Sequence, residues 1–176
     1  AETGSGKTAA YLLPVLDRLI KQSTDSGSVA PRPVRVLVLA PTRELVVQIE
    51  DDLQGFVYHT GLTSVAVFGG TPIGPQAQAL TAGVDVIVAT PGRLLDHLRS
   101  GLPSFNQLAT LILDEADRML DMGFWPDVRR IVASMPATPP EDEHRRQTLL
   151  FSATIPDWVL TPLKELAHEP AYVQIG

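Results

Sequence analysis

Short apolar runs alternate with amphipathic stretches along the whole chain. Residues 34–39 (VRVLVL) are almost continuously apolar, which is typical of a strand that is buried on both faces of a sheet. Runs of the same kind occur at residues 64–68, 84–89, 110–113, 148–151 and 171–175. We therefore expect an α/β fold whose mostly parallel sheet is built from these segments.

Between these runs, apolar side chains recur at the spacing of a helix. The two clearest stripes consist of Leu12, Val15, Leu16 and Leu19, and of Leu45, Ile49, Leu53 and Phe56. We expect further helices at 93–99, 127–134 and 157–167. Pro14 should kink the first helix, because a proline inside a helix has no N–H to donate. Alternating strands and helices predict right-handed crossovers, with helices on both faces of the sheet.

The composition is that of one ordinary globular domain. Of 176 residues, 44% are hydrophobic and 19% are charged, which is enough for one core. The formal net charge is −6, so any contact with nucleic acid must depend on a local patch or on backbone amides. The lack of cysteine excludes disulfides and thiolate metal sites and agrees with a reducing cytoplasm, where we expect the protein. No apolar run is long enough to predict a membrane span.

The first eight residues, AETGSGKT, have the character of a phosphate-binding loop. Gly4 and Gly6 permit a tight turn whose amides converge, and the helix that follows favours an anion at its N-terminus. Lys7 supplies a positive charge for the outer phosphates, and the Thr8 hydroxyl can ligate magnesium. Ala1 stands where the general pattern has glycine. The alternative interpretation is a simple turn before a helix with an exposed lysine.

An acidic run follows directly after an apolar strand candidate. Residues 111–113 (LIL) lead into Asp114, Glu115, Ala116 and Asp117, and ligands of open α/β sheets bind at the carboxyl ends of the strands. Asp114 can hold magnesium through water, and Glu115 can orient or deprotonate an attacking water. Alternatively, the run is an acidic helix N-terminus that complements the helix dipole. Together with the lysine loop, it indicates a magnesium-dependent nucleoside triphosphatase.

Several short motifs occur in one order along the chain. They are AETGSGKT, PTREL with Gln48, Gly69-Gly70, TPGR, DEAD, RMLDMGF and SAT. In this set the chain resembles the first, N-terminal RecA-like domain of a DEAD-box ATP-dependent RNA helicase, and RRQTLLFSAT and GFWPDVRRI are similar to bacterial members. The resemblance covers residues 1–176 and implies a RecA-like P-loop fold, a three-layer sandwich around a mostly parallel sheet.

The resemblance implies a role for each motif. The residues implied to bind ATP are Thr3, Gly4, Ser5, Gly6, Lys7 and Thr8. Magnesium would be held by Thr8 and Asp114, and the catalytic residues would be Glu115, Asp114 and Lys7. The residues implied to contact the backbone of one RNA strand are Pro41, Thr42, Arg43, Gly69, Gly70, Thr90, Pro91, Gly92 and Arg93. The residues implied to couple nucleotide state to RNA binding are Asp117, Ser152, Ala153 and Thr154.

The chemistry of these residues agrees with the implied roles, although each has a simpler reading. Arg43 and Arg93 can pair with phosphate in bidentate fashion, and glycines let RNA approach the main chain. Such backbone contacts predict little sequence preference. Thr42 could instead cap a helix. Thr90-Pro91 and Gly69-Gly70 could belong to ordinary turns. Ser152 and Thr154 could be plain hydroxyls at a strand end.

The chain also departs from the family's pattern. Residues 1–176 do not include the family's adenine-recognition glutamine segment, the strand that leads into the phosphate loop or the second RecA-like domain, so they predict no preference for adenine. We expect a poorly stable fragment that hydrolyses ATP barely and does not unwind duplexes, because the second domain supplies arginine fingers. The alternatives are a DNA-directed P-loop translocase and a binding-only fragment without turnover.

Overall fold

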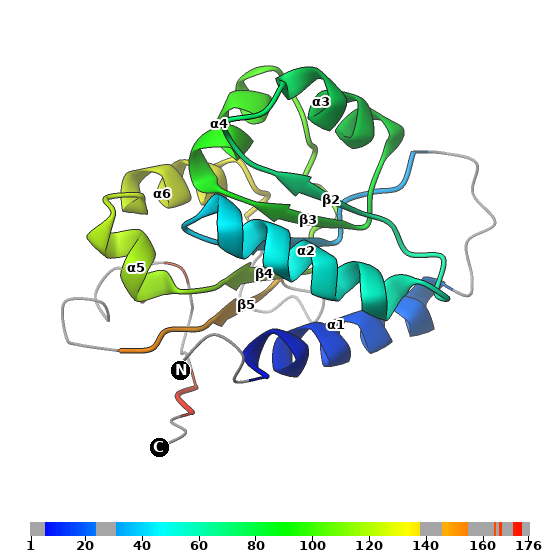
Figure 1. Ribbon diagram of the computed structural model, residues 1–176, viewed down its shortest axis with the longest axis horizontal. Helices are drawn as coiled ribbons and strands as arrows, with labels where there is room; N and C mark the ends of the chain where they lie inside the picture. Colours follow the sequence, from blue (N-terminus) through cyan, green and yellow to red (C-terminus); the bar gives the residue numbers. More distant parts are fainter. Residues whose placement is uncertain are drawn as a thin grey trace.

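The fold is a single parallel sheet between two layers of helices (Figure 1). The computed structural model describes residues 6–23, 31–137, 146–154, 164, 166 and 171–173. The strands are β1 (Val36–Leu39), β2 (Ser64–Val67), β3 (Val86–Ala89), β4 (Thr110–Leu113) and β5 (Gln147–Leu150). Their order is β2-β3-β1-β4-β5, and every pair is parallel. The expected α/β class is confirmed.

Side chains of the central strands alternate between two hydrophobic cores. In β1, Val36 and Val38 enter the core beneath one helix layer, whereas Leu37 and Leu39 enter the other. All residues of β1, β3 and β4 are buried, as the continuous apolar runs predicted. Strand β5 pairs only with β4 among the described residues, and most of it is half-buried.

One layer consists of α1 (Lys7–Ser23) and α2 (Arg43–Val57), which run side by side (Figure 1). The predicted stripe of α1 is buried, and Pro14 lies on the exposed side of this unbroken helix. In α2 the prediction was wrong at one position. Val57, four residues after Leu53, completes the buried stripe, whereas Phe56 is 37% exposed. Both positions fit helical spacing, so only packing could decide between them.

The other layer consists of α3 (Ile73–Ala82), α4 (Pro91–Arg99), α5 (Ala116–Asp121) and α6 (Trp125–Ala133). Helices α4 and α6 cover the predicted segments 93–99 and 127–134 almost completely. The predicted helix 157–167 lies outside the described residues, apart from 164 and 166. The predicted strand 171–175 was wrong over its described part, because residues 171–173 have no strand conformation. None of the described helices is long and apolar enough to cross a membrane.

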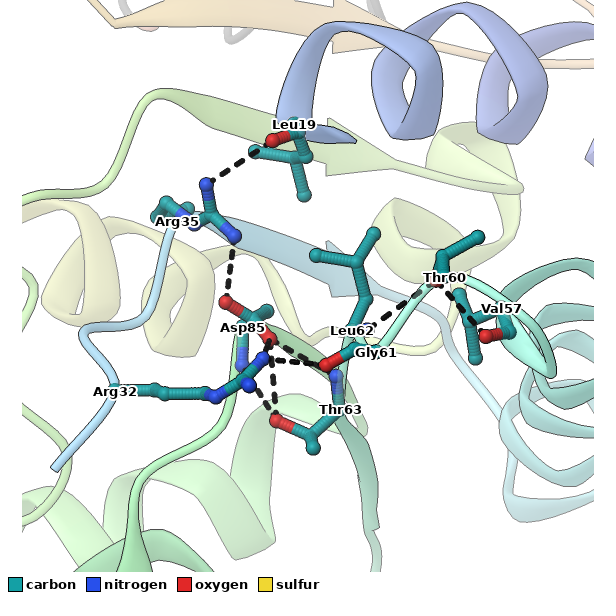
Figure 2. A network of polar contacts seen from close by, with 9 residues as sticks. All are labelled: Leu19, Arg32, Arg35, Val57, Thr60, Gly61, Leu62, Thr63 and Asp85. Atoms are coloured by element: carbon teal, nitrogen blue, oxygen red, sulfur yellow. Dashed lines mark hydrogen bonds and ion pairs between the residues drawn. The ribbon is translucent and has the colours of Figure 1, made fainter. Parts of the chain in front are cut away.

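A buried carboxylate ties together the amino ends of the strands (Figure 2). Asp85 accepts hydrogen bonds from Arg35 at 2.6 Å, from Arg32 at 2.9 Å and from the Thr63 backbone N–H at 2.9 Å. Arg35 also donates to the carbonyl of Leu19 in α1 over 3.4 Å. The network therefore joins the segment before β1 to the starts of β2 and β3 and to α1, at the edge opposite the predicted site.

Candidate functional site

The motifs PTREL, Gly69-Gly70, TPGR, DEAD and SAT each follow the carboxyl end of a strand, at one edge of the sheet. The strand register aligns the last residues of the strands, which are Val67, Ala89, Leu39, Leu113 and Leu150. Just beyond them, the backbone hydrogen bonds continue between the first residue of each loop and the last residue of the neighbouring strand. Each of the following backbone bonds is between 2.8 and 3.0 Å long: Thr90 to Val67, Ala40 to Ala89, Asp114 to Leu39 and Phe151 to Leu113. This edge therefore positions the candidate side chains on a common frame.

The structure brings Lys7 and Asp114 together. Lys7 is the first residue of α1, and its Nζ lies 3.5 Å from Asp114 Oδ1. The side chain of Lys7 is 20% exposed, whereas Asp114 is 2% exposed. A lysine at the helix N-terminus beside a buried carboxylate has the charges needed to hold phosphate and a divalent cation. Thr3, Gly4 and Ser5 lie outside the described residues.

Tyr11 belongs to this cluster and was missed from the sequence. Its hydroxyl donates to Asp114 Oδ2 over 3.0 Å. Burial and the nearby negative charge of Asp114 raise the pKa of Tyr11, although a hydrogen bond with the Thr8 side chain opposes them. The phenol therefore remains a donor at neutral pH. The aromatic residue at an i+4 spacing from Lys7 was the only sequence signal, and it is equally typical of a core position.

Glu115 occupies a strained backbone conformation. Its φ of 51° places it in the left-handed region, and among the described residues it is the only non-glycine with a positive φ. Such a conformation costs about 1–3 kcal/mol and is concentrated at functional sites. Arg118 lies 3.2 Å from the Glu115 carboxylate. The two adjacent carboxylates thus have different partners: Asp114 contacts Lys7 and Tyr11, whereas Glu115 pairs with Arg118.

Asp117 contacts the Ser152-Ala153-Thr154 motif, as the resemblance implied. The backbone N–H and the hydroxyl of Thr154 both donate to Asp117 Oδ2 over 3.0 Å. Ser152 in turn donates to the Thr154 carbonyl over 2.5 Å. Burial alone would raise the pKa of Asp117, but the bonds from Thr154, together with weaker ones, lower it. The acidic run and the β5 loop are therefore joined by an ionised carboxylate.

The loops after β1 and β2 lie against each other. Thr42 is the N-cap of α2 and accepts a bond from the Leu45 N–H over 3.3 Å, so its simpler role as a cap is real. The exposed Arg43 guanidinium stacks over the Phe68 ring, 5.1 Å from its centroid. Gly70 has a φ of 81°, and a β-carbon there would lie 3.5 Å from the same guanidinium. Arg43 and the loop that contains Gly69 and Gly70, which we call the glycine loop, therefore form one exposed surface.

A buried polar pair supports the glycine loop from below. Gln76 of α3 donates to the Phe68 carbonyl over 3.0 Å and to the Thr71 hydroxyl over 2.9 Å. His97 of α4 lies 3.3 Å from the Gln76 side-chain oxygen. Arg93, whose side chain is 14% exposed, donates to the Thr71 carbonyl over 2.9 Å. Any contact of Arg93 with phosphate would thus use its remaining N–H groups.

The donor set fits magnesium, provided that a ligand completes it. Asp114 and Thr8 offer oxygen atoms, which magnesium prefers, and magnesium in proteins commonly takes its other ligands from water and substrate phosphates. No group of three or more His, Cys, Asp or Glu side chains that could hold a metal occurs in the part of the chain that the structure describes. These residues therefore suit a cation that arrives with a nucleotide.

Comparison with known proteins identifies relatives over the whole chain. A family described as DEAD/DEAH box helicase matches residues 1–163. "DEAD-box ATP-dependent RNA helicase 30" of Arabidopsis thaliana is 45% identical over 100% of this chain and 28% of its own length. "ATP-dependent RNA helicase RhlB" of Pseudomonas putida is 46% identical over 99% of this chain and 43% of its own length.

A solved structure has the same fold. The crystal structure of a hypothetical ATP-dependent RNA helicase from Sulfolobus tokodaii superimposes with a TM-score of 0.76 at 35% identity, over 96% of this chain and 44% of that one. The chain thus spans less than half the length of these relatives.

Proposed function

Since this chain belongs to the DEAD/DEAH box helicase family, we propose that it binds ATP with magnesium and the backbone of single-stranded RNA. In the whole protein it would couple ATP hydrolysis to local unwinding of RNA duplexes, together with a second RecA-like domain. The relatives extend well beyond the length of this chain, which supports that partner. A cytoplasmic location remains a prediction.

The contact between Lys7 and Asp114 is the observation that carries the proposal. A charged pair 3.5 Å apart links the start of α1 to the end of β4, although the two residues are far apart in the sequence. Lys7 would hold the outer phosphates, Thr8 and Asp114 would hold magnesium, and Glu115 would orient or deprotonate the attacking water. When bound, magnesium would neutralise the charge that develops on the phosphates.

The RNA would lie on the other half of the same edge. Strands β2, β3 and β1 carry the glycine loop, the Thr90–Arg93 segment and the Pro41–Arg43 segment side by side. Gly69, Gly70 and Gly92 are exposed there, as is Arg43. Glycines and an arginine suit close contact with a sugar–phosphate backbone and read little sequence. Asp117 and the motif after β5 would report the nucleotide state to this surface.

Steady-state ATP hydrolysis by the protein expressed from its complete gene tests this function. We expect RNA to stimulate turnover more than DNA of the same sequence. Lys7→Ala should lower turnover by about 10²-fold or more, because it removes a charge that stabilises the transition state. Lys21→Ala is the matched control, since Lys21 lies on the same helix with a 74% exposed side chain.

Two outcomes would contradict the proposal in different ways. Equal stimulation by RNA and DNA would favour the DNA-directed translocase. Nucleotide binding without any turnover in the unaltered protein would favour a binding-only role.

A further inference from the structure

The two oxygens of the Asp114 carboxylate have different surroundings. Oδ2 accepts the hydrogen bond of the Tyr11 hydroxyl over 3.0 Å. Oδ1 accepts a bond from the Glu115 backbone N–H over 2.9 Å and lies 3.5 Å from Lys7 Nζ. Residues of α1 therefore approach both oxygens: the Tyr11 hydroxyl bonds to Oδ2, and Lys7 at the start of the helix faces Oδ1.

We propose that Tyr11 is a positioning residue, whose hydroxyl holds the Asp114 carboxylate so that Oδ1 faces the phosphate loop. This inference rests on the proposed function, in which Asp114 helps to hold magnesium. Carboxylates at metal sites are commonly oriented by hydrogen bonds from neighbouring groups, and loss of such a neighbour weakens metal binding by about 10–100-fold. Among the described residues, Tyr11 is the only one whose side chain donates to Oδ2.

Close packing around the Tyr11 side chain fixes the position of its hydroxyl. Tyr11 lies one helical turn after Lys7, so both side chains project from the same face of α1. Its ring is 1% exposed and meets the Phe151 ring at a centroid distance of 4.9 Å. The backbone of Phe151 bonds to both flanks of the acidic turn, to the Leu113 carbonyl over 2.8 Å and to the Ala116 N–H over 3.0 Å. The Tyr11 ring is thus packed against Phe151, whose backbone is bonded to both sides of the turn that carries Asp114.

The hydroxyl also has the right chemistry for this task. A phenol has an ordinary pKa of about 10, so the Tyr11 hydroxyl is a neutral donor at neutral pH. A neutral donor holds one carboxylate oxygen without adding a positive charge that would repel the cation.

Tyr11→Phe tests the inference because it keeps the ring and removes only the hydroxyl. The affinity of the protein from its complete gene for a fluorescent ADP analogue is measured in EDTA and at increasing Mg²⁺ concentrations. We expect the Mg²⁺ concentration for half-maximal tightening to rise about 10-fold or more, while the affinity in EDTA stays within about twofold. Tyr58→Phe is the control, since Tyr58 is 81% exposed, and it should match the unaltered protein.

The outcomes separate this inference from the proposed function. An unaltered protein whose ADP affinity does not respond to Mg²⁺ would overturn the nucleotide function itself. If the unaltered protein responds and Tyr11→Phe responds at the same Mg²⁺ concentration, only the role of Tyr11 is overturned. An equal loss of affinity with and without Mg²⁺ would also overturn it, because that pattern indicates packing alone.

A second measurement needs no variant and covers the case in which Tyr11→Phe does not fold. In the nuclear magnetic resonance spectrum of the unaltered protein, the Tyr11 hydroxyl proton should be protected from exchange and should shift when Mg²⁺ joins the ADP complex. A protected proton that does not shift would contradict the proposed position of Tyr11.

Discussion

Replacing Asp85 by Asn should destabilise the domain strongly, although the residue is remote from the candidate site. Asp85 is 2% exposed and accepts bonds from two arginines and from Thr63 (Figure 2). Asparagine keeps the volume but removes the charge and turns an amide N–H₂ toward groups that are all donors. Arg35, whose side chain is 16% exposed, would then lack its carboxylate partner.

The magnitude follows from the exposure of the two arginines. Leaving one partner of a buried ion pair uncompensated costs about 3–5 kcal/mol, whereas an exposed pair contributes about 0–1 kcal/mol. Arg35 is close to the first case, and Arg32, with a half-exposed side chain, is close to the second. Because asparagine retains one acceptor, we expect a loss of about 2–4 kcal/mol from a total on the order of 5–15 kcal/mol.

Urea denaturation followed by circular dichroism measures this loss. With a slope of about 2 kcal/mol per molar urea, the midpoint should fall by about 1–2 M. Asp17→Asn is the control, because Asp17 pairs with Lys21 on an exposed helix surface, and its effect should stay below about 1 kcal/mol. A midpoint for Asp85→Asn that matches the control would refute the reasoning.

The effect of Asp85 should also depend on pH. Burial alone would raise the pKa of Asp85, but the bonds from Thr63, Arg35 and Arg32 lower it below the ordinary value. A carboxyl with a lowered folded-state pKa contributes its stabilisation fully above its unfolded pKa, about 3.9, and loses it as the pH falls through the folded value. The difference between the unaltered protein and Asp85→Asn should therefore be constant at neutral pH and shrink below about pH 4. A difference that grows on acidification would contradict this sign.

Three further outcomes are expected. Gly83→Ala should destabilise the domain by about 2 kcal/mol or more in urea denaturation, because φ is +89° and a β-carbon would overlap the main chain before β1. Gly74→Ala in α3, which has open space around it, is the control and should be neutral or stabilise by up to about 1 kcal/mol. Gln76→Leu should weaken RNA binding about 10-fold in fluorescence anisotropy without changing ADP affinity, since it removes two bonds to the glycine loop. An RNA affinity equal to that of the unaltered protein would contradict the supporting role of Gln76. Burial and the nearby Arg93 lower the pKa of His97, so its neutral form is favoured in the folded state. Stability in urea denaturation should therefore fall as the pH drops below about 6.5, and His97→Gln should show a smaller dependence on pH.

Strands were predictable wherever burial on both faces left a continuous apolar run. Residues 34–39 and 110–113 needed no other signal, and β1 and β4 lie within them. Helix α3 was missed because its sequence, IGPQAQALTA, contains Pro75 and buries only Gln76 and Leu80, which leaves almost no apolar stripe. The choice between Phe56 and Val57 depended on neighbours that the local sequence does not specify.

The candidate site was predictable as motifs, but only some of its contacts were. Lys7 and Asp114 belong to recognisable patterns, and the packing of α1 beside the end of β4 brings them together. Tyr11 reaches a carboxylate 103 positions away, and Asp85 reaches Arg35 across 50 positions. Residues of these types are common in cores and on surfaces, so their partners became visible only in three dimensions.

The hydrogen bonds between the loop bases have a mechanical consequence. Asp114 is bonded to Leu39, Ala40 to Ala89 and Thr90 to Val67, so an unbroken chain of main-chain bonds crosses from the lysine–carboxylate half to the glycine half. The first residue of each of these loops cannot slide along the sheet without breaking the hydrogen bond to the neighbouring strand. In the proposed function, coupling between ATP and RNA would then run through loop tips and side chains such as Asp117 and Thr154, while the sheet serves as a fixed platform.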